Sequence, residues 1–376
     1  ETTHVAPANG DTLIQGGCVS CGACVDACPS GALYDKRSTQ AVEKWTRSTC
    51  VYCGVGCQME VGSAAGKVVQ IRPADSPVNH GHLCVKGRYA FEFNHAPDRI
   101  TTPMLRDGAG WRPVSWDEAL DFTADRLKQI VAQYGADACG VLGSARATNE
   151  ENYLAQKFAR LVLGTNNVDC CARVCHQPSA KALKTMLGTG AATNAFDDIE
   201  VAQAFLICGC NPTENHPIVG ARIKQAVRNG ARLIVVDPRF NRTAAVADQY
   251  VPIRAGSDIV FLGGIINWLI ANDKIHWDYV KAYTNASLIV KEEYGFDEGL
   301  FSGFDAEKSK YDRASWNYEL DANGAAKRDP SLEHPRCVWN LMKAHFSRYT
   351  PELVTSLTGS PKEGFLAVCQ QLGETA

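Results

Sequence analysis

The sequence predicts an α/β protein with a doubly wound parallel sheet, preceded by two small cysteine-rich segments. Residues 202–239 form a predicted strand, helix and second strand, a βαβ unit that favours a parallel sheet. Eight of the 16 cysteines fall into two compact groups before residue 90. At 376 residues, the chain is long enough for two or three domains.

The charge and the apolar pattern exclude some classes of partner. The chain has 38 basic and 41 acidic residues, a formal net charge of −3, and no long basic run. Binding to nucleic acid or to a membrane surface therefore receives no support. The longest apolar stretch, residues 259–271, is too short to span a bilayer and contains Asn267. We therefore expect no transmembrane segment in this chain.

The first cysteine group is the run CVSCGACVDACP, which contains Cys18, Cys21, Cys24 and Cys28. This is the C-x2-C-x2-C-x3-C-P spacing with which bacterial ferredoxins bind [4Fe–4S] clusters. A zinc site would normally have two separated pairs of ligands, so iron and sulfur are favoured. In two-cluster ferredoxins the fourth cysteine of such a run serves the other cluster. If that pattern holds, Cys28 and one corner of this cluster need partners from outside this sequence.

The second cysteine group combines a C-x2-C-x3-C triplet with a fourth cysteine 27 residues later: Cys50, Cys53, Cys57 and Cys84. Four thiolates again suit one [4Fe–4S] cube, and Gly54, Gly56 and Gly81 give the backbone freedom to wrap it. A zinc ribbon, the alternative, would usually have two C-x2-C pairs. Two one-electron centres imply that another part of the chain supplies electrons.

The rest of the chain has an α/β pattern. A helix is expected between the capping box of Ser115 and Glu118 and a stop at Gly135. The apolar run 139–143 predicts a strand, and residues 149–164 predict a further helix.

The βαβ unit contains the most regular pattern. The apolar run 202–209 predicts a buried strand, and residues 232–239 predict the next one. The helix between them, residues 216–230, begins near Pro217 and places apolar residues on one stripe. Such a helix is expected to pack on the sheet.

Ligands of such sheets bind at the carboxyl ends of the strands. The loop CGCNPTENHP follows the first strand, and Asp237 and Arg239 follow the second. An acidic residue at the second position suits a ribose diol, but the first loop lacks G-x-G-x-x-G, so an NAD site is doubtful. A nucleotide held without that turn fits better. Alternatively, Asp237 only caps the next helix.

Cys175 and His176 are adjacent in a turn-rich segment after GTNNVD. A lone cysteine is more often buried and inert. A neighbouring imidazole can accept a proton or hold the thiol as a thiolate. Both a Cys–His nucleophile and a soft ligand for a heavy transition metal are therefore open interpretations.

Taken together, the second cysteine group, the CVKG after Cys84, and the motifs CARVCH, GCNPTENHP and VDPR define a resemblance. In this order, over residues 46–376, they resemble the catalytic subunit of molybdopterin-dependent formate dehydrogenases. That family holds molybdenum or tungsten by two pterin guanine dinucleotides and one Cys or selenocysteine. The resemblance implies that Cys175 is this ligand, in a cysteine-type enzyme, and that His176 takes or relays the proton of formate.

The resemblance also assigns binding residues. Lys86 would lie between the second cluster and the nearer pterin and aid electron passage. The remaining positions would contact one guanine dinucleotide: Cys210, Asn211, Glu214, Asn215, Asp237, Arg239, Gly256 and Asp258.

By the same resemblance, the chain is expected to comprise a partial ferredoxin-like segment (1–44), a [4Fe–4S] domain (45–105) and a molybdopterin-binding α/β region (106–376). Residues 293–336 show no helix or strand period and are interpreted as a surface insertion. The family's catalytic arginine would lie beyond residue 376, so we expect the N-terminal portion of a larger subunit, cut at both ends. Arg173 is a weak local substitute.

The expected function is oxidation of formate to carbon dioxide, or the reverse, with electrons passed to an iron–sulfur or flavin subunit. A nitrate reductase of the same superfamily and a non-catalytic subunit of the respiratory complex I type are the alternatives. The latter would have no reason to carry Cys175 and His176. Unassigned cysteines such as Cys139 and Cys337 favour a cytoplasmic location, although periplasmic relatives exist. The ligand types do not distinguish molybdenum from tungsten.

Overall fold

The computed structural model describes residues 12–13, 18–37, 40–297 and 299–375. The chain divides into two compact units. Unit 1 comprises residues 1–199 and 216–219, and unit 2 comprises residues 200–215 and 220–376. This boundary falls inside the region 106–376 and separates two parallel sheets.

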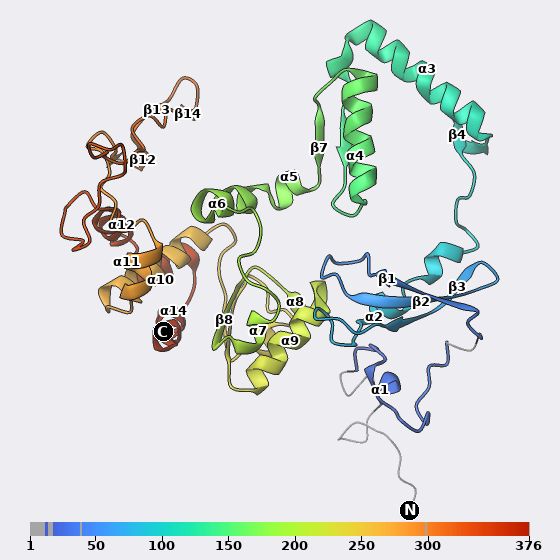
Figure 1. Cartoon of the computed structure of the whole chain (residues 1–376), viewed down its shortest axis with the longest axis horizontal. Coiled ribbons are helices and arrows are strands. Elements are labelled where there is room, and N and C mark those ends of the chain that lie inside the picture. The colour runs from blue at the N-terminus through green and yellow to red at the C-terminus, as the bar shows by residue number, and fades with distance from the viewer. Residues whose placement is uncertain (1–11, 14–17, 38–39, 298, 376) are drawn as a thin grey trace, which may run out of the picture. The chain divides into compact units, whose positions relative to one another are not determined.

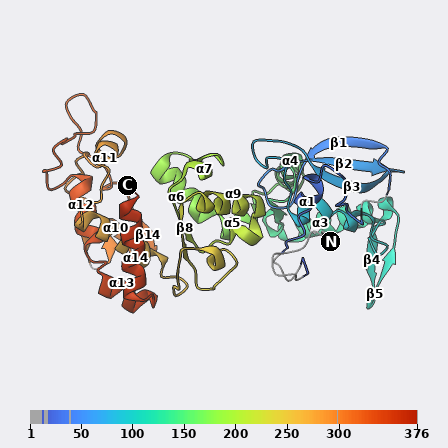
Figure 2. The same cartoon turned by 90° about the horizontal axis from the view of Figure 1, so that it is seen from below.

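Unit 1 begins with a short helix and a three-stranded antiparallel sheet of order β1-β2-β3, drawn in blue in Figures 1 and 2. Its elements are α1 (Ala23–Asp26), β1 (Lys44–Thr49), β2 (Gln58–Ala64), β3 (Lys67–Pro73), α2 (Val85–Tyr89) and the 3-10 turn η1 (Glu92–His95). Met59 of β2 and Ile71 of β3 belong to a buried hydrophobic cluster, whose other members are Val55, Cys57, Leu83 and Ile218. The second cysteine group is therefore built into a hydrophobic core.

The remainder of unit 1 contains the predicted helices and a two-stranded parallel sheet, β6-β7. Its elements are β4 (Met104–Asp107), β5 (Gly110–Pro113), α3 (Trp116–Tyr134), η2 (Ala136–Ala138), β6 (Val141–Gly143), α4 (Asn149–Lys157), η3 (Phe158–Leu163), β7 (Val168–Cys170), α5 (Ala172–Cys175), α6 (Gln177–Leu187) and α7 (Asp198–Val201), which reaches into unit 2.

The ends of these helices follow the local signals in the sequence. The Ser115 hydroxyl accepts the N–H of Glu118 at 3.2 Å, and Gly135 ends α3, as predicted. Helix α4 begins at Asn149 after a complete capping box on Thr148. The predicted stop at Gly164 is also present, but the chain reaches it through a π-helical turn, η3, that the periodicity did not indicate. The apolar stripe of helix α3 is only partly covered: Leu120 is 59% exposed, whereas Leu127 and Val131 are half-buried.

Unit 2 contains the predicted parallel sheet, of order β10-β9-β8. Its first elements are β8 (Ala204–Cys208), α8 (Pro212–Asn215), α9 (Pro217–Arg228), β9 (Arg232–Val236), η4 (Ala244–Val246) and β10 (Gln249–Val251). Helix α9 is the crossover between β8 and β9, and it buries Ile223 and Ala226. The βαβ unit therefore forms as the sequence predicted.

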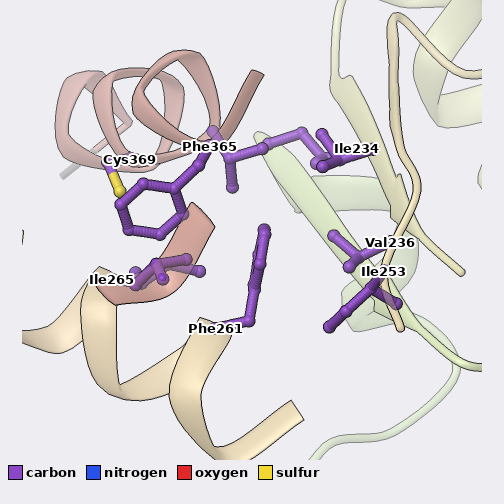
Figure 3. Close-up of a cluster of buried hydrophobic side chains, with 10 residues drawn as sticks. Ile234, Val236, Ile253, Phe261, Ile265, Phe365 and Cys369 are labelled. Carbon is purple, nitrogen blue, oxygen red and sulfur yellow. The ribbon is translucent and has the colours of Figure 1, made fainter. Parts of the chain in front are cut away.

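Both faces of β9 are buried. Side chains alternate between the faces of a strand, so Leu233 and Val235, both 0% exposed, point away from Ile234 and Val236. Figure 3 shows the second face packing against α10 (Asp258–Ala271) and α14 (Lys362–Glu374). Phe261 and Phe365 meet there edge to face, with ring centroids 5.3 Å apart. Coverage on both faces is the doubly wound arrangement.

The last elements of unit 2 surround the predicted insertion. They are α11 (Trp277–Tyr283), β11 (Phe296–Asp297), β12 (Leu300–Phe301), β13 (Phe304–Asp305), β14 (Lys310–Tyr311), α12 (Val338–Phe346) and α13 (Pro351–Thr358). The stretch 293–336 contains β11 to β14, and two-residue strands are too short to give a sequence period. Within the described ranges, no helix has the length and apolar content needed to cross a bilayer.

Candidate functional site

The second cysteine group is assembled by the ends of β1 and β2 and the start of α2. Cys50 follows β1, and its N–H donates to the carbonyl of Cys57 at 2.9 Å. Cys57 is 5% exposed, and Cys84 precedes the first residue of α2. Burial, and then the neighbouring thiols of the group, raise the pKa of Cys57 to about 12. The structure therefore brings together the four thiols that the sequence predicted as one ligand set.

The four thiols act on one another electrostatically, so they can offer four sulfur donors to one bound group. A single zinc ion would require sulfur atoms about 2.3 Å from the metal. A cube of iron and sulfur holds its thiolates farther apart and supplies the positive charge that four crowded thiolates require. The donor set therefore fits a [4Fe–4S] cluster.

Lys86 lies beside this group, on the first turn of α2. Burial raises the pKa of Cys50, and the ammonium of Lys86 opposes that rise. The helix is in close contact with the group, because a Cβ placed on Gly87 would lie 3.6 Å from the Cys50 sulfur. Lys86 thus stands where the sequence predicted a residue next to the second cluster.

Asn79 fixes the loop between Cys57 and Cys84, a role that the sequence analysis missed. This side chain is 2% exposed. Its oxygen accepts the N–H of Gln58 at 2.8 Å and the hydroxyl of Ser76 at 2.6 Å. Its nitrogen donates to the carbonyls of Gln58, Ala74 and His82 at 2.9–3.2 Å. Only its place between two ligand cysteines could have indicated this role.

The first cysteine group lies on an open loop around α1. Cys18 and Cys24 are exposed, and Cys21 and Cys28 are half-buried. Backbone N–H groups point at the sulfurs: Ser20 donates to Cys18 at 3.3 Å, and Leu33 donates to Cys28 at 3.4 Å. Hydrogen bonds from Ser30 and then Leu33 lower the pKa of Cys28 to about 7. Donors aimed at thiolates are what an iron–sulfur loop requires.

Cys175 and His176 follow the parallel strand β7. Cys175 is the last residue of α5, His176 links α5 to α6, and both side chains are exposed. They therefore emerge past the carboxyl end of a parallel strand, where α/β sheets bind ligands. Arg173 is paired with Asp169 at 2.5 Å, and this guanidinium, followed by the N–H of Cys170, lowers the pKa of Asp169. The guanidinium of Arg173 is thus already paired with the carboxylate of Asp169.

A contact through the loop after β6 links this segment to the second cysteine group. The N–H of Ala145 donates to the sulfur of Cys171 at 3.3 Å. The guanidinium of the next residue, Arg146, donates to the carbonyl of Tyr52, which lies between Cys50 and Cys53. No local pattern in the sequence marks Arg146, because its partner lies 94 residues away.

In unit 2, the loops after β8 and β9 begin at the same sheet edge, because Cys208 pairs with Val236. The Asn211 side chain is 5% exposed and accepts the hydroxyl of Thr243 at 2.8 Å. It also donates to Glu214, whose carboxylate lies 3.3 Å from Arg242. The structure therefore joins Asn211 and Glu214 to a partner, Thr243, that sequence reasoning missed.

Asp237 organises the second of these loops. It is 8% exposed, and its two oxygens accept the N–H of Arg239 at 2.7 Å and the amide of Asn241 at 3.1 Å. Asp237 therefore has a structural role as well, and its assignment to a ribose stays a prediction. To bind a ribose, the Asp237 oxygens would have to accept hydrogen bonds from its hydroxyls in addition to those from Arg239 and Asn241.

The other predicted nucleotide contacts lie on exposed backbone: Cys210, Asn215, Arg239, Gly256 and Asp258. Asp258 is the first residue of α10 and lies near Cys208, at the end of β8. Burial, and then the Asp258 carboxylate, raise the pKa of the Cys208 thiol. Gly256 has a φ of 84°, which a side chain would strain. Cys175 and His176 lie in unit 1, whereas this set lies in unit 2.

Family comparisons agree with this geometry. Residues 43–95 match the molybdopterin oxidoreductase Fe4S4 domain, and residues 99–277 match the molybdopterin oxidoreductase domain. Residues 12–34 match a 4Fe-4S binding domain. The chain thus carries the domains of the molybdopterin oxidoreductase family with two iron–sulfur segments, and its cofactors are [4Fe–4S] clusters and molybdopterin with molybdenum or tungsten.

Within this class, the chain resembles formate dehydrogenase major subunits. It is 46% identical to the formate dehydrogenase-O major subunit of Escherichia coli and 44% identical to the nitrate-inducible major subunit, over 93% of this chain in each case. It is 37% identical over 92% of its length to the alpha subunit from Megalodesulfovibrio gigas. The chain spans 36–37% of the length of these relatives.

A solved structure shares the fold. The chain aligns with acetylene hydratase from Pelobacter acetylenicus with a TM-score of 0.60 and 22% identity, over 86% of this chain and 38% of that one. At this identity, the likeness concerns the fold alone.

Proposed function

We propose that the protein to which this chain belongs oxidises formate to carbon dioxide, with Cys175 as the protein ligand of molybdenum or tungsten. The observation that carries the proposal is the Cys175–His176 pair past the end of a parallel strand, in a chain 46% identical to a formate dehydrogenase major subunit. Electrons would leave singly through the two cysteine groups to an iron–sulfur or flavin subunit. A pterin-bound metal supplies two-electron chemistry, which a single iron–sulfur cube does not.

The residues of this chain would divide the work as follows. The exposed thiolate of Cys175 would bind the metal, and the imidazole of His176, the next residue, would take or relay the proton of formate. Asn211 and Glu214 are held in place from Thr243 and Arg242, so they can present fixed polar groups to a guanine dinucleotide. Lys86, beside Cys50, would stand between the second cluster and the pterin.

Formate also needs a cation to orient its carboxylate. Arg173 is poorly suited to this role, because Asp169 already holds its guanidinium at 2.5 Å. By the resemblance, this cation would come from the part of the relatives' length that this chain does not span.

Two assays with the full-length protein, purified without oxygen, test this function. We expect reduction of a dye by formate and no oxidation of a reduced dye by nitrate. The reverse pattern would make the protein a nitrate reductase. We also expect roughly eight iron atoms and about one molybdenum or tungsten atom per chain. Iron in that amount without either heavy metal would indicate an electron-transfer subunit of the respiratory complex I type.

His176→Ala tests the proton acceptor. Removing a positioned base should slow formate oxidation by roughly two to four orders of magnitude, with the metal content unchanged. Lys184→Ala, an exposed change on the following helix, is the matched control and should leave the rate unchanged. Equal rates for both variants would remove His176 from the mechanism.

A cytoplasmic location is part of the proposal. The unassigned Cys139, Cys208, Cys337 and Cys369 are free thiols in the structure, which suits a reducing compartment. Fractionation of cells with the activity as the marker tests this, and activity released with the periplasmic contents would contradict it.

A further inference from the structure

Arg88 is a buried cation next to the first cysteine group. It lies on α2, is 4% exposed, and its guanidinium pairs with Asp26. Its Nε donates to the carbonyl of Cys21 at 3.0 Å, although the two residues are 67 positions apart. Burying a guanidinium is costly unless it is paired, so the site is built around this side chain.

The backbone of the first group fits closely over that guanidinium. Gly22 precedes α1 with a φ of 76°, and a Cβ at this position would lie 2.5 Å from the Arg88 Nε. Glycine is therefore required twice here, by its backbone conformation and by the close approach of Arg88. The loop that carries Cys21 and Cys24 rests directly on the arginine.

The other end of Arg88 belongs to the second cysteine group. Its N–H donates to the carbonyl of Cys84 at 3.1 Å, and its neighbour Gly87 faces the sulfur of Cys50. Arg88 therefore contacts both cysteine groups: its backbone N–H contacts the second group, and its guanidinium contacts the first.

We propose that Arg88 is a positioning residue between the two clusters, which docks the first loop on α2 and raises the reduction potential of the first cluster. The proposal rests on the electron relay of the proposed function. One electron leaves the cluster of Cys50–Cys84 and enters that of Cys18–Cys28, with no bond or proton exchanged. A nearby positive charge favours the reduced, more negative state of a cluster, because net charge helps to set its potential.

Asp26 allows the sign of this effect to be tested. Its carboxylate lies inside the first cysteine run and partly offsets the charge of Arg88. Neutralising Arg88 should lower the potential of the first cluster, and neutralising Asp26 should raise it. Damage to the loop alone would not produce two shifts of opposite sign.

The experiment is an EPR-monitored redox titration of the full-length holoenzyme, with dithionite as the reductant. In Arg88→Gln, we expect the oxidised-to-reduced ratio of the first cluster at a fixed potential to rise about tenfold, which is 59 mV for one electron. The potential of the second cluster should shift less. In Arg88→Lys, which keeps the positive charge, the potential of the first cluster should stay close to its original value. Asp26→Asn should shift the potential of the first cluster in the opposite direction, to a higher value.

Arg37→Gln is the matched control, because this arginine pairs with Glu92 on the same side of the domain but is 65% exposed. It should leave both potentials unchanged. If Arg88→Gln loses the iron of the first group, Asp26→Asn carries the test. An unchanged potential of the first cluster in Arg88→Gln or in Asp26→Asn, with the iron retained, would overturn the proposal. Because dithionite replaces formate, the result stands even if the proposed substrate is wrong.

Discussion

The two cysteine groups each provide four thiols, but the second group is the more buried of the two. Cys57, in the second group, is 5% exposed and packs in a hydrophobic cluster that includes residues of the three-stranded sheet. Cys18 and Cys24, in the first group, are exposed on a loop whose only helix has four residues. Solvent exposure and hydrogen bonds to sulfur help to set the reduction potential of a cluster, so two clusters with four cysteine ligands each can differ in potential.

This difference suggests a division of roles along the relay. A buried cluster is shielded from solvent and from direct reaction with outside acceptors. An exposed cluster can approach a partner protein closely. In the relay proposed above, the first group would deliver electrons to another subunit, and the second group would receive them inside the chain.

The largest expected effect comes from removing one ligand of each group. Cys57→Ser and Cys24→Ser should each lower the iron content from roughly eight to about four atoms per chain. Cys57→Ser should also abolish the reduction of dye by formate and lower the thermal midpoint, because an unpaired buried hydroxyl costs about 1–3 kcal/mol.

Cys24→Ser should retain the reduction of dye but lose electron delivery to the partner subunit. Iron analysis, dye assays and thermal unfolding of both variants provide the comparison. If Cys24→Ser unfolds as easily as Cys57→Ser, the contrast between a buried and an exposed group is wrong.

A smaller effect is expected from Asn79→Ala, which leaves the ligand set of the second group intact. The substitution removes the five hydrogen bonds of the Asn79 side chain, of which the one to the Ala74 carbonyl is buried and the others are partly buried or local. A loss of about 2–3 kcal/mol follows, or roughly 5–10 °C in the melting temperature. Asn94→Ala is the control, since this exposed side chain donates only to the carbonyl of Phe91. Equal melting temperatures for the two variants would contradict the role of Asn79.

The sequence predicts those parts of the fold that have local signals. Ser115 and Gly135 bound α3 as expected, and Pro217 begins α9, because caps and proline act within a few residues. The strands at 204–208 and 232–236 follow from long apolar runs. The four two-residue strands after residue 295 do not, because no period can be recognised over two residues.

The residues of the candidate site also fall into those with a local sequence signal and those without one. Cysteine spacing indicates the ligands of both groups, the position after a strand indicates Asp237, and the family resemblance assigns Asn211. Arg88 and Arg146 could not be found, because their partners lie 67 and 94 residues away along the chain. Contacts of that kind depend on the tertiary fold, which no local pattern encodes.

The pKa values of the thiols sharpen the comparison further. In the cluster-free chain, the pKa of Cys28 is lowered from an ordinary thiol value to about 7, and that of Cys57 is raised to about 12. Since the thiolate is the reactive form, Cys28 should react with iodoacetamide half-maximally near pH 7, and Cys57 should stay protected until far higher pH. Mass spectrometry after labelling at stepped pH measures both. Labelling of the two thiols at the same pH would show that their surroundings are alike.

The smallest effect is expected from Glu92→Gln, which removes an exposed ion pair between the two regions. Glu92 and Arg37 are 3.3 Å apart and both 65% exposed, so the pair should contribute less than about 1 kcal/mol and weaken further in salt. The melting temperature and the potential of the first cluster should therefore hardly change. Arg88 makes the same kind of pair from a buried position, where water cannot replace the lost partner. If Glu92→Gln shifted the potential of the first cluster as far as Arg88→Gln does, the potential would depend on the charge of the whole surface. The burial of Arg88 would then have no special effect on it.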